Sequence, residues 1–253
     1  MSFSVGSLFA GIGGFDLGVE RAGCRIEWQV EIDPWCRKVL AKHWPEVPRY
    51  EDVKEVGAHN LNPVDWIVGG FPCQDLSTAG KQEGLSGDRS GLWWQMRRII
   101  GELRPEIVIV ENVPNLINLG IEHVLGSLAE LGYDAEWDIV SAQDIGAPHL
   151  RKRVWIVAHP ESVFGDGCND YAEHSQTTSR KFGRSDSSAR RGDSPRWTTE
   201  PAMGRMAHGI PDRVDRLKGL GNAVVPQVVE WIARQIIYYS AKGERSGTSK
   251  TLV

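Results

Sequence analysis

Apolar and polar residues alternate along this chain in short blocks that predict strands and helices in turn. Short β-prone runs predict strands at residues 5–9, 26–30, 66–68, 106–110, 135–141 and 154–158. Apolar residues at helical spacing predict helices at residues 15–22, 34–42, 92–103, 121–131 and 226–237. This alternation is typical of an α/β protein with a mostly parallel sheet and helices on both of its faces.

The regular pattern is lost between residues 159 and 197, where Ser, Gly, Asp and Arg dominate. No helix or strand is predicted there, and regularity returns near Pro201. We therefore divide the chain into residues 1–158, an irregular region at 159–205 and a final segment at 206–253.

The composition is that of an ordinary soluble globular protein, with 253 residues of which 41% are hydrophobic and 25% charged. No apolar run approaches the roughly 20 residues of a membrane span, and the start has no basic region typical of an export signal. We expect a cytoplasmic protein without membrane contact. The four cysteines are widely spaced and form no CxxC pair, so we expect neither a metal site nor a disulfide framework.

The charge is unevenly distributed along the chain. The net charge of −4 argues against a surface that is uniformly basic for nucleic-acid binding. Between Arg180 and Arg196, however, basic residues clearly outnumber acidic ones. Both a nucleic-acid contact surface and a solvated loop are compatible with this run, because it is also rich in Ser and Gly.

A glycine-rich turn follows the first predicted strand and precedes the first helix. Such a strand, turn and helix open a nucleotide-binding unit, in which a ligand lies against backbone amides. Asp16 occupies the third position of a GxGxxG motif, which favours a ligand other than a pyrophosphate. Glu31 follows Gly11 at about the interval of a ribose-binding acid, although a surface acid after an edge strand has the same pattern. Asp52 and Val53 form a possible third contact.

Cys73 lies just beyond the strand at residues 66–68, after two glycines and Pro72. Ligands of open α/β sheets bind at this edge, and proline stiffens the backbone there. A buried, inert thiol is the alternative, but the hydrophilic neighbours of Cys73 weaken it. Residues 75–91 contain four glycines and almost no apolar residue, which predicts a mobile loop that closes over a substrate.

Charged residues follow two further strands. Glu111 is expected at the same sheet edge as Cys73, where it either serves the site or caps the next helix. Arg151 and Arg153 point the same way if their segment is extended, so they are predicted to converge on one anion or carbonyl. Surface charge without a function is the alternative for this pair.

These motifs occur in an order that resembles the DNA (cytosine-5) methyltransferases, from Ser7 to Trp231. The matching residues are 9–14, Glu31 with Asp33, 71–74 followed by 80–82, 111–113, Arg151 with Arg153, and 221–224. The resemblance implies a Rossmann-like methyltransferase sheet, S-adenosylmethionine as methyl donor and a cytosine flipped out of duplex DNA. It also implies that 1–158 is the catalytic domain, 159–205 a small target-recognition region and 206–253 a return to the catalytic domain.

The resemblance assigns catalytic roles to four residues. Cys73 would add as a thiolate to carbon 6 of cytosine, which makes carbon 5 nucleophilic. Glu111, in its neutral form, would bind ring nitrogen 3 and the exocyclic amine. Arg153 would hold the ring oxygen, and Arg151 would steady the pocket.

The resemblance also assigns the cofactor and DNA contacts. The cofactor residues would be Phe9, Gly11, Ile12, Gly13, Gly14, Glu31, Ile32, Asp52, Val53, Pro72, Leu92, Asn222 and Ala223. Glu31 would bind the ribose, Asp52 the adenine amine, and Asn222 would bring the C-terminal helix beside the first strand. The expected DNA contacts are Gln74, Ser77, Lys81, Gln82, Arg89, Arg184, Arg190 and Arg191.

The sequence departs from the family pattern at His149, where glutamine is usual, and in the short stretch between Arg153 and Gly221. We expect a monomer that acts on double-stranded DNA, with a cognate restriction endonuclease acting separately as a possible partner. A transfer-RNA cytosine methyltransferase, a nicotinamide-dependent oxidoreductase that uses Cys73, and a noncatalytic DNA-binding module remain as alternatives.

Overall fold

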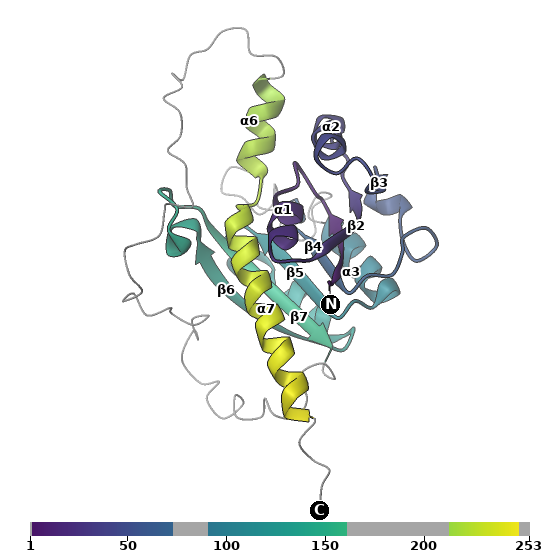
Figure 1. The fold of residues 1–253 in the computed structure, drawn as a ribbon, viewed down its shortest axis with the longest axis vertical. Coiled ribbons are helices and arrows are strands. Elements are labelled where there is room, and N and C mark those ends of the chain that lie inside the picture. Colours follow the sequence, from purple (N-terminus) through teal and green to yellow (C-terminus); the bar gives the residue numbers. More distant parts are fainter. Residues whose placement is uncertain (1, 73–90, 161–212, 248–253) are drawn as a thin grey trace, which may run out of the picture.

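A computed structural model of the chain describes residues 2–72, 91–160 and 213–247 (Figure 1). The strands are β1 (Ser4–Leu8), β2 (Arg25–Val30), β3 (Arg49–Tyr50), β4 (Trp66–Gly69), β5 (Ile107–Asn112), β6 (Tyr133–Ser141) and β7 (Lys152–Pro160). The α-helices are α1 (Gly14–Arg21), α2 (Pro34–His43), α3 (Leu92–Leu103), α4 (Leu116–Leu119), α5 (Ile121–Ala129), α6 (Arg213–Asn222) and α7 (Pro226–Gly247). Short 3₁₀ helices are η1 (Val53–Glu55) and η3 (Ala142–Ile145). The predicted α/β alternation is confirmed.

The strands form one sheet in the order β3-β2-β1-β4-β5-β7-β6. The strands from β3 to β5 in this order are parallel, whereas β7 is antiparallel to both of its neighbours. The usual dinucleotide-binding sheet is parallel with the order 3-2-1-4-5-6. The inserted antiparallel β7 therefore distinguishes this sheet from that of a nicotinamide-dependent oxidoreductase.

Helices cover both faces of the sheet, as β5 illustrates. Ile107 and Ile109 belong to a buried cluster that includes α1 and α7. Val108 and Val110, which point to the opposite face, belong to a second cluster that includes α3 and α5. Because both faces are buried, the central strands are continuous apolar runs rather than alternating ones. The cores thus hold the carboxyl ends of β1, β2, β4 and β5 at one edge.

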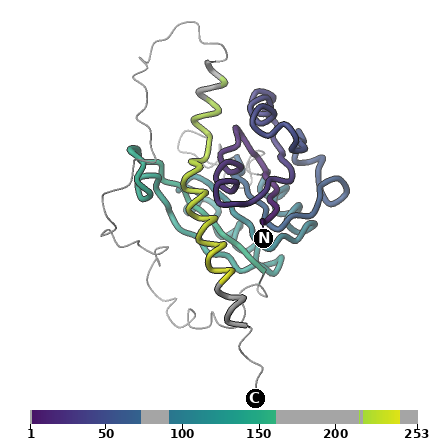
Figure 2. Tube along the Cα trace, viewed as in Figure 1, coloured from purple at the N-terminus to yellow at the C-terminus, as the bar shows by residue number. Residues whose placement is uncertain are grey.

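The C-terminal helix α7 packs against α1, on one face of the sheet (Figure 2). Glycine permits this contact, since a Cβ on Gly18 would lie 2.4 Å from Val229 Cβ and 2.6 Å from the Pro226 carbonyl oxygen. Similarly, a Cβ on Gly14 would lie 2.6 Å from the Val224 carbonyl oxygen. The expectation placed α7 beside the first strand: α7 shares a buried cluster with Val5 of β1, and it packs most extensively on α1, the helix that follows this strand.

A buried polar network connects β1, β2 and α1. The fully buried carboxylate of Asp16 accepts hydrogen bonds from Ser7 Oγ at 3.1 Å and from Gln29 Nε2 at 2.8 Å. Burial raises the pKa of Asp16 to about 6, although both hydrogen bonds oppose the shift. The network holds β1, β2 and α1 in fixed relative positions. It thereby fixes both ends of the glycine turn, which connects β1 to α1.

Helix α6 was not predicted from the sequence. Gly219 and Gly221 fall within its ten residues, and each glycine costs a helix interior about 1 kcal/mol relative to alanine. Its tertiary contacts, described below, compensate for this weak propensity. Strand β3 and helix α4 were also missed, because runs of two and four residues carry no periodic signal.

Two cysteines lie in the described part of the chain, outside the glycine turn. Cys24 and Cys36 are buried, and burial raises their thiol pKa to about 11 and about 12, so both are inert. Within the described ranges, no three His, Cys, Asp or Glu side chains are grouped as metal ligands. No helix in these ranges has the length and apolar character to cross a membrane.

Replacement of Gly18 by alanine is expected to destabilise the protein, because the new Cβ would collide with Val229 and Pro226. Overpacking of this kind costs about 1–3 kcal/mol, measured by chemical denaturation. The matched control is Gly126→Ala in α5, where a Cβ would meet no atom within 4 Å. The control should be unchanged or slightly more stable, since alanine favours a helix. Equal effects of both changes would contradict the packing argument.

Replacement of Asp16 by asparagine is expected to change how stability depends on pH. A raised carboxyl pKa means that the folded wild type binds its proton more tightly than the unfolded chain, so wild-type stability falls as pH rises through about 6. Relative to Asp16→Asn, the wild type should lose about 2 kcal/mol between pH 4.5 and 7 in urea denaturation. Parallel curves for the two proteins would show that Asp16 does not titrate in this range.

Candidate active site

The glycine turn after β1 has an unusual backbone. Gly11 and Gly13 have φ values of 56° and 86°, in the left-handed region that glycine adopts without strain. Phe9 also lies in this region, with a φ of 54°, which is costly for a bulky residue and is typical of functional sites. The Ala10 amide donates to the Val30 carbonyl at 3.1 Å, so the turn is attached to the end of β2.

Glu31, at the end of β2, holds this turn in place. Its Oε2 accepts a hydrogen bond from the Gly11 amide and its Oε1 from the Asp33 amide, both at 2.7 Å. Burial raises the pKa of Glu31, and the two backbone hydrogen bonds oppose this shift. The alternative of a surface acid is wrong, because Glu31 is buried and β2 is not an edge strand. Its oxygens retain lone pairs for ligand hydroxyls.

Two predicted cofactor residues lie beside Glu31. Ile32 follows it with a side chain that is 66% exposed, which leaves an apolar surface next to the carboxylate. Asp52 follows the end of β3, and the Glu31 amide donates to the Tyr50 carbonyl at 3.0 Å, so both acids lie at one sheet edge. The Asp52 carboxylate caps η1 by accepting from the Lys54 amide at 2.9 Å.

The ends of β4 and β5 bring Glu111 against the segment that precedes Cys73. The two strands pair in parallel with Gly69 beside Val110. A Cβ on Gly70 would lie 3.0 Å from Glu111 Oε2, and Asn112 Nδ2 donates to the Phe71 carbonyl at 3.1 Å. Cys73 itself lies outside the described residues, but the chain leading to it adjoins the Glu111 carboxylate.

Glu111 is paired with Arg153. Arg153 Nε donates to Glu111 Oε1 at 2.8 Å, and both side chains are largely buried. Burial raises the pKa of Glu111, while the charges of Arg153 and Arg151 oppose the increase. The helix-capping alternative is wrong, because α4 begins after Asn115 and has no side-chain cap. Glu111 is thus a buried acid whose pKa is raised by burial despite its arginine partner.

Arg151 and Arg153 line the same cavity and the charges of both lower the pKa of Glu111, which agrees with the predicted convergence, but their direct hydrogen-bond partners differ. Both terminal nitrogens of Arg151 donate to the Gly221 carbonyl at 3.1 Å, at the end of α6. Its buried Nε has no hydrogen-bond partner among the described residues. From this shared cavity, Arg153 bonds to Glu111 of β5, whereas Arg151 bonds to Gly221 at the end of α6.

A cavity of about 570 Å³ lies between the glycine turn, the start of β7 and the α6–α7 connection. Its lining includes Ile12, Gly13, Gly14, Leu17, His149, Leu150, Arg151, Lys152, Arg153, Leu220, Ala223, Val224, Val225, Pro226 and Gln227. Of the predicted cofactor residues, Phe9, Gly11, Glu31, Ile32, Asp52, Val53, Pro72, Leu92 and Asn222 are not part of this lining. Asn222 is exposed, between lining residues on both sides. The cavity therefore lies between the glycine turn after β1 and the side chains of Arg151 and Arg153.

Helix α6 is held against the turn by contacts that the sequence did not predict. Lys218 Nζ contacts Asp33 Oδ2 at 2.9 Å, and a Cβ on Gly219 would lie 2.7 Å from Trp35 and 3.2 Å from Ile12. The N-cap position of Asp33 before Pro34 predicts its helix-capping bonds but not this ion pair. Asp16 and Asn112 are further positioning residues that were missed, because only the folded chain shows their partners.

The expected DNA contacts Gln74, Ser77, Lys81, Gln82, Arg89, Arg184, Arg190 and Arg191 lie outside the described residues. The described part of the site therefore combines three features: a strained glycine turn with a buried acid, a buried Glu–Arg pair, and a cavity between them.

Known proteins resemble this chain over most of the described sheet. The family model "C-5 cytosine-specific DNA methylase" matches residues 3–193. Type II methyltransferase M2.BsuMI of Bacillus subtilis is 38% identical over 168 residues, which cover 63% of this chain and 42% of that protein. Type II methyltransferase M.HhaI of Haemophilus parahaemolyticus is 32% identical over 154 residues, covering 59% and 47%. The matched region thus spans less than half of these relatives.

Solved structures of methyltransferases also resemble this chain. A candidate DNA modification methyltransferase encoded in an E. coli prophage has a TM-score of 0.55 at 32% identity, covering 64% of this chain and 47% of that one. The Spodoptera frugiperda DNMT2 structure has a TM-score of 0.54 at 20% identity, covering 64% and 51%, and supports the Rossmann-like fold alone. The sheet, the order of the motifs and the family match together place this chain in the C-5 cytosine-specific DNA methylase family.

Proposed function

We propose that this protein transfers a methyl group from S-adenosylmethionine to carbon 5 of a cytosine in double-stranded DNA. The observation that carries the proposal is the buried Glu111–Arg153 pair, which lies against the chain leading to Cys73. A cofactor turn lies across the same cavity. The relatives that carry the name Type II methyltransferase support the reaction class.

The residues present fit an adenosine-containing methyl donor. A Cβ on Gly11 would meet no atom within 4 Å, so the turn leaves room for a ligand there, and the lone pairs of Glu31 suit ribose hydroxyls. Ile32 offers an apolar surface for the adenine ring, and Asp52 a carboxylate for its amine. Phe9, Ile12, Gly14, Val53, Pro72, Leu92, Asn222 and Ala223 complete the proposed site. When bound, S-adenosylmethionine supplies an electrophilic methyl group.

Cys73 is the proposed nucleophile. Carbon 5 of cytosine is too weak a nucleophile to take a methyl group from a sulfonium directly. Addition of the Cys73 thiolate to carbon 6 forms a carbon–sulfur bond and, with a proton delivered to nitrogen 3, makes carbon 5 an enamine carbon. After methylation, loss of the carbon 5 proton to a base expels the thiolate and restores the aromatic ring.

Glu111 is the proposed proton donor to nitrogen 3. A carboxyl group can donate this hydrogen bond only when it is neutral, and burial raises the pKa of Glu111 in that direction. Arg153 keeps the carboxyl oriented through its bond to Oε1 and is proposed to reach the ring oxygen with a remaining donor. Arg151 steadies the cavity wall through Gly221.

The remaining parts of the proposal concern DNA and organisation. We propose that residues 1–158 and 206–253 form the catalytic unit and that 159–205 recognise the target. Gln74, Ser77, Lys81, Gln82 and Arg89 would contact the flipped-out site, and Arg184, Arg190 and Arg191 the flanking duplex, since cations bind phosphates. We propose that the enzyme acts as a cytoplasmic monomer, separately from any cognate restriction endonuclease.

Bisulfite sequencing of plasmid DNA incubated with the enzyme and S-adenosylmethionine is expected to show protected cytosines within one short sequence. Cys73→Ala should abolish this protection, because the adduct at carbon 6 cannot form, while calorimetry shows unchanged binding of S-adenosylhomocysteine. Methylation that persists in Cys73→Ala would refute the covalent mechanism. Methyl transfer to total RNA instead of DNA would favour the transfer-RNA alternative, and binding of NADH without S-adenosylhomocysteine would favour an oxidoreductase.

Glu111→Ala is expected to slow methyl transfer by roughly 10²-fold or more, because general acid catalysis contributes about that factor. Binding of S-adenosylhomocysteine should change little, since Glu111 contacts Arg153 and Gly70 rather than the glycine turn. The matched control is Glu106→Ala, which removes an exposed carboxylate from the other end of β5. Single-turnover methylation assays compare the two. A similar loss in both variants would show that Glu111 acts through stability alone.

A further inference from the structure

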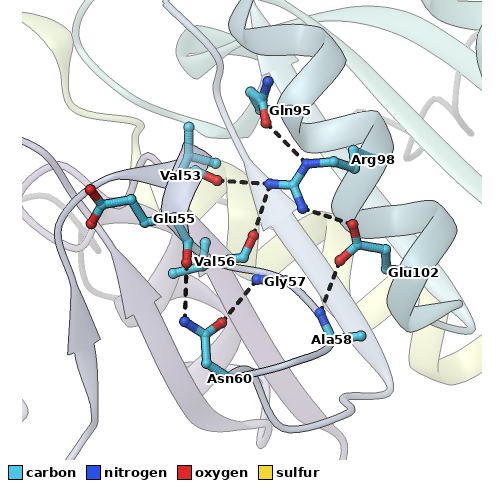
Figure 3. A network of polar contacts seen from close by, with 9 residues as sticks. All are labelled: Val53, Glu55, Val56, Gly57, Ala58, Asn60, Gln95, Arg98 and Glu102. Carbon is cyan, nitrogen blue, oxygen red and sulfur yellow. Dashed lines mark hydrogen bonds and ion pairs between the residues drawn. The ribbon is translucent and has the colours of Figure 1, made fainter.

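The segment from Asp52 to Asn60 lies between β3 and β4 and is held in place by one arginine of α3 (Figure 3). Arg98 Nη2 donates to the Val53 carbonyl at 3.0 Å and to the Val56 carbonyl at 2.8 Å. Val53 is the first residue of η1 and Val56 is its C-cap, so a single guanidinium binds both ends of η1. Hydrogen bonds from a charged donor are the stronger kind.

The other nitrogens of Arg98 keep its guanidinium in position. Nη1 contacts Glu102 Oε1 at 2.8 Å, and Nε donates to Gln95 Oε1 at 3.0 Å (Figure 3). Glu102 in turn accepts from the Ala58 amide at 2.9 Å, so helix α3 binds the segment at a third backbone group. Arg98 therefore cannot change its orientation without losing contacts on its own helix.

The segment also packs closely against Glu102 of α3. A Cβ on Gly57 would lie 2.3 Å from Glu102 Oε2, so its backbone already touches the carboxylate. Asn60 closes the turn from the far side, accepting from the Gly57 amide at 3.0 Å and donating to the Glu55 carbonyl at 3.1 Å. The position of η1 is thus determined by its contacts with α3.

Asp52 is the N-cap of η1, so the position of η1 determines the position of Asp52. Its Oδ1 accepts from the Lys54 amide, whereas no described residue donates to its Oδ2. Arg98 binds the carbonyl of Val53, the residue that directly follows Asp52. A displacement of η1 would therefore move the free carboxylate oxygen at the ligand-binding edge of the sheet.

We propose that Arg98 is a positioning residue that sets the Asp52 carboxylate to accept a hydrogen bond from the 6-amino group of the cofactor's adenine. Arg98 thereby determines selectivity for an aminopurine over an oxopurine. This inference rests on the proposed function, in which Asp52 faces the adenine. Arg98 itself does not touch the ligand.

The test compares two ligands by calorimetry: S-adenosylhomocysteine, and S-inosylhomocysteine, in which an oxygen replaces the 6-amino group. Arg98→Met, which keeps the apolar stem, is expected to lower the preference for the amino ligand on the order of tenfold, the value of one charged hydrogen bond. Binding of the oxo ligand should change much less. In an Asp52→Ala background, which removes the carboxylate, Arg98→Met should have no further effect on the preference.

The matched control is Arg97→Met. Arg97 is the adjacent residue of α3 and also pairs with a glutamate, Glu130 at 2.8 Å, but it contacts α5 and the residue that follows it rather than η1. This variant should retain the wild-type preference between the two ligands. A general loss of α3 stability would affect both arginine variants, whereas a positioning role affects the ligand ratio only in Arg98→Met.

An equal loss of affinity for both ligands in Arg98→Met would overturn the inference, because a structural role alone predicts that result. If Arg98→Met does not fold, Arg98→Lys replaces it: lysine cannot span both carbonyls and Glu102, so the same fall in ratio is expected, and an unchanged ratio overturns the inference. Failure of the wild type to bind S-adenosylhomocysteine would instead refute the proposed function.

Discussion

The parallel pairing of β4 with β5 is the interaction on which the site depends. Its register sets Gly69 beside Val110, so Gly70, which follows β4, and Glu111 of β5 meet at the sheet edge. A register slip of one residue would turn Glu111 toward the opposite face, away from Arg153. The buried apolar residues on both faces of β5 make such a slip costly. The core thus fixes the position of the proposed catalytic acid.

Burying a carboxylate costs free energy, and this protein compensates that cost with a different kind of partner at each of three sites. Asp16 is compensated by two neutral side-chain donors, Glu31 by two backbone amides and Glu111 by an arginine. Burial raises the pKa of all three. Of these three carboxylates, Glu111 is the one paired with a permanent positive charge, which opposes the rise of its pKa.

The C-terminal helices complete the site from the far end of the chain. Helix α7 packs on α1 through glycine contacts, and α6 reaches the turn through Lys218, Gly219 and the bond of Arg151 to Gly221. These contacts join segments separated by more than 180 residues in one case, Asp33 with Lys218. The cavity wall therefore exists only in the folded chain, and its integrity depends on interactions between both ends of the sequence.

The sequence by itself determined the alternation of strands and helices, because apolar periodicity records which side of each element is buried. It also indicated Glu31 and Glu111, since a polar residue directly after an apolar strand marks the ligand-binding edge. The tertiary structure decided what no local pattern records: the antiparallel β7, helix α6 with its two glycines, the separate partners of Arg151 and Arg153, and the bonds of Arg98 to the Asp52 segment. Each of these depends on contacts between residues far apart in the chain, where local propensity carries no information.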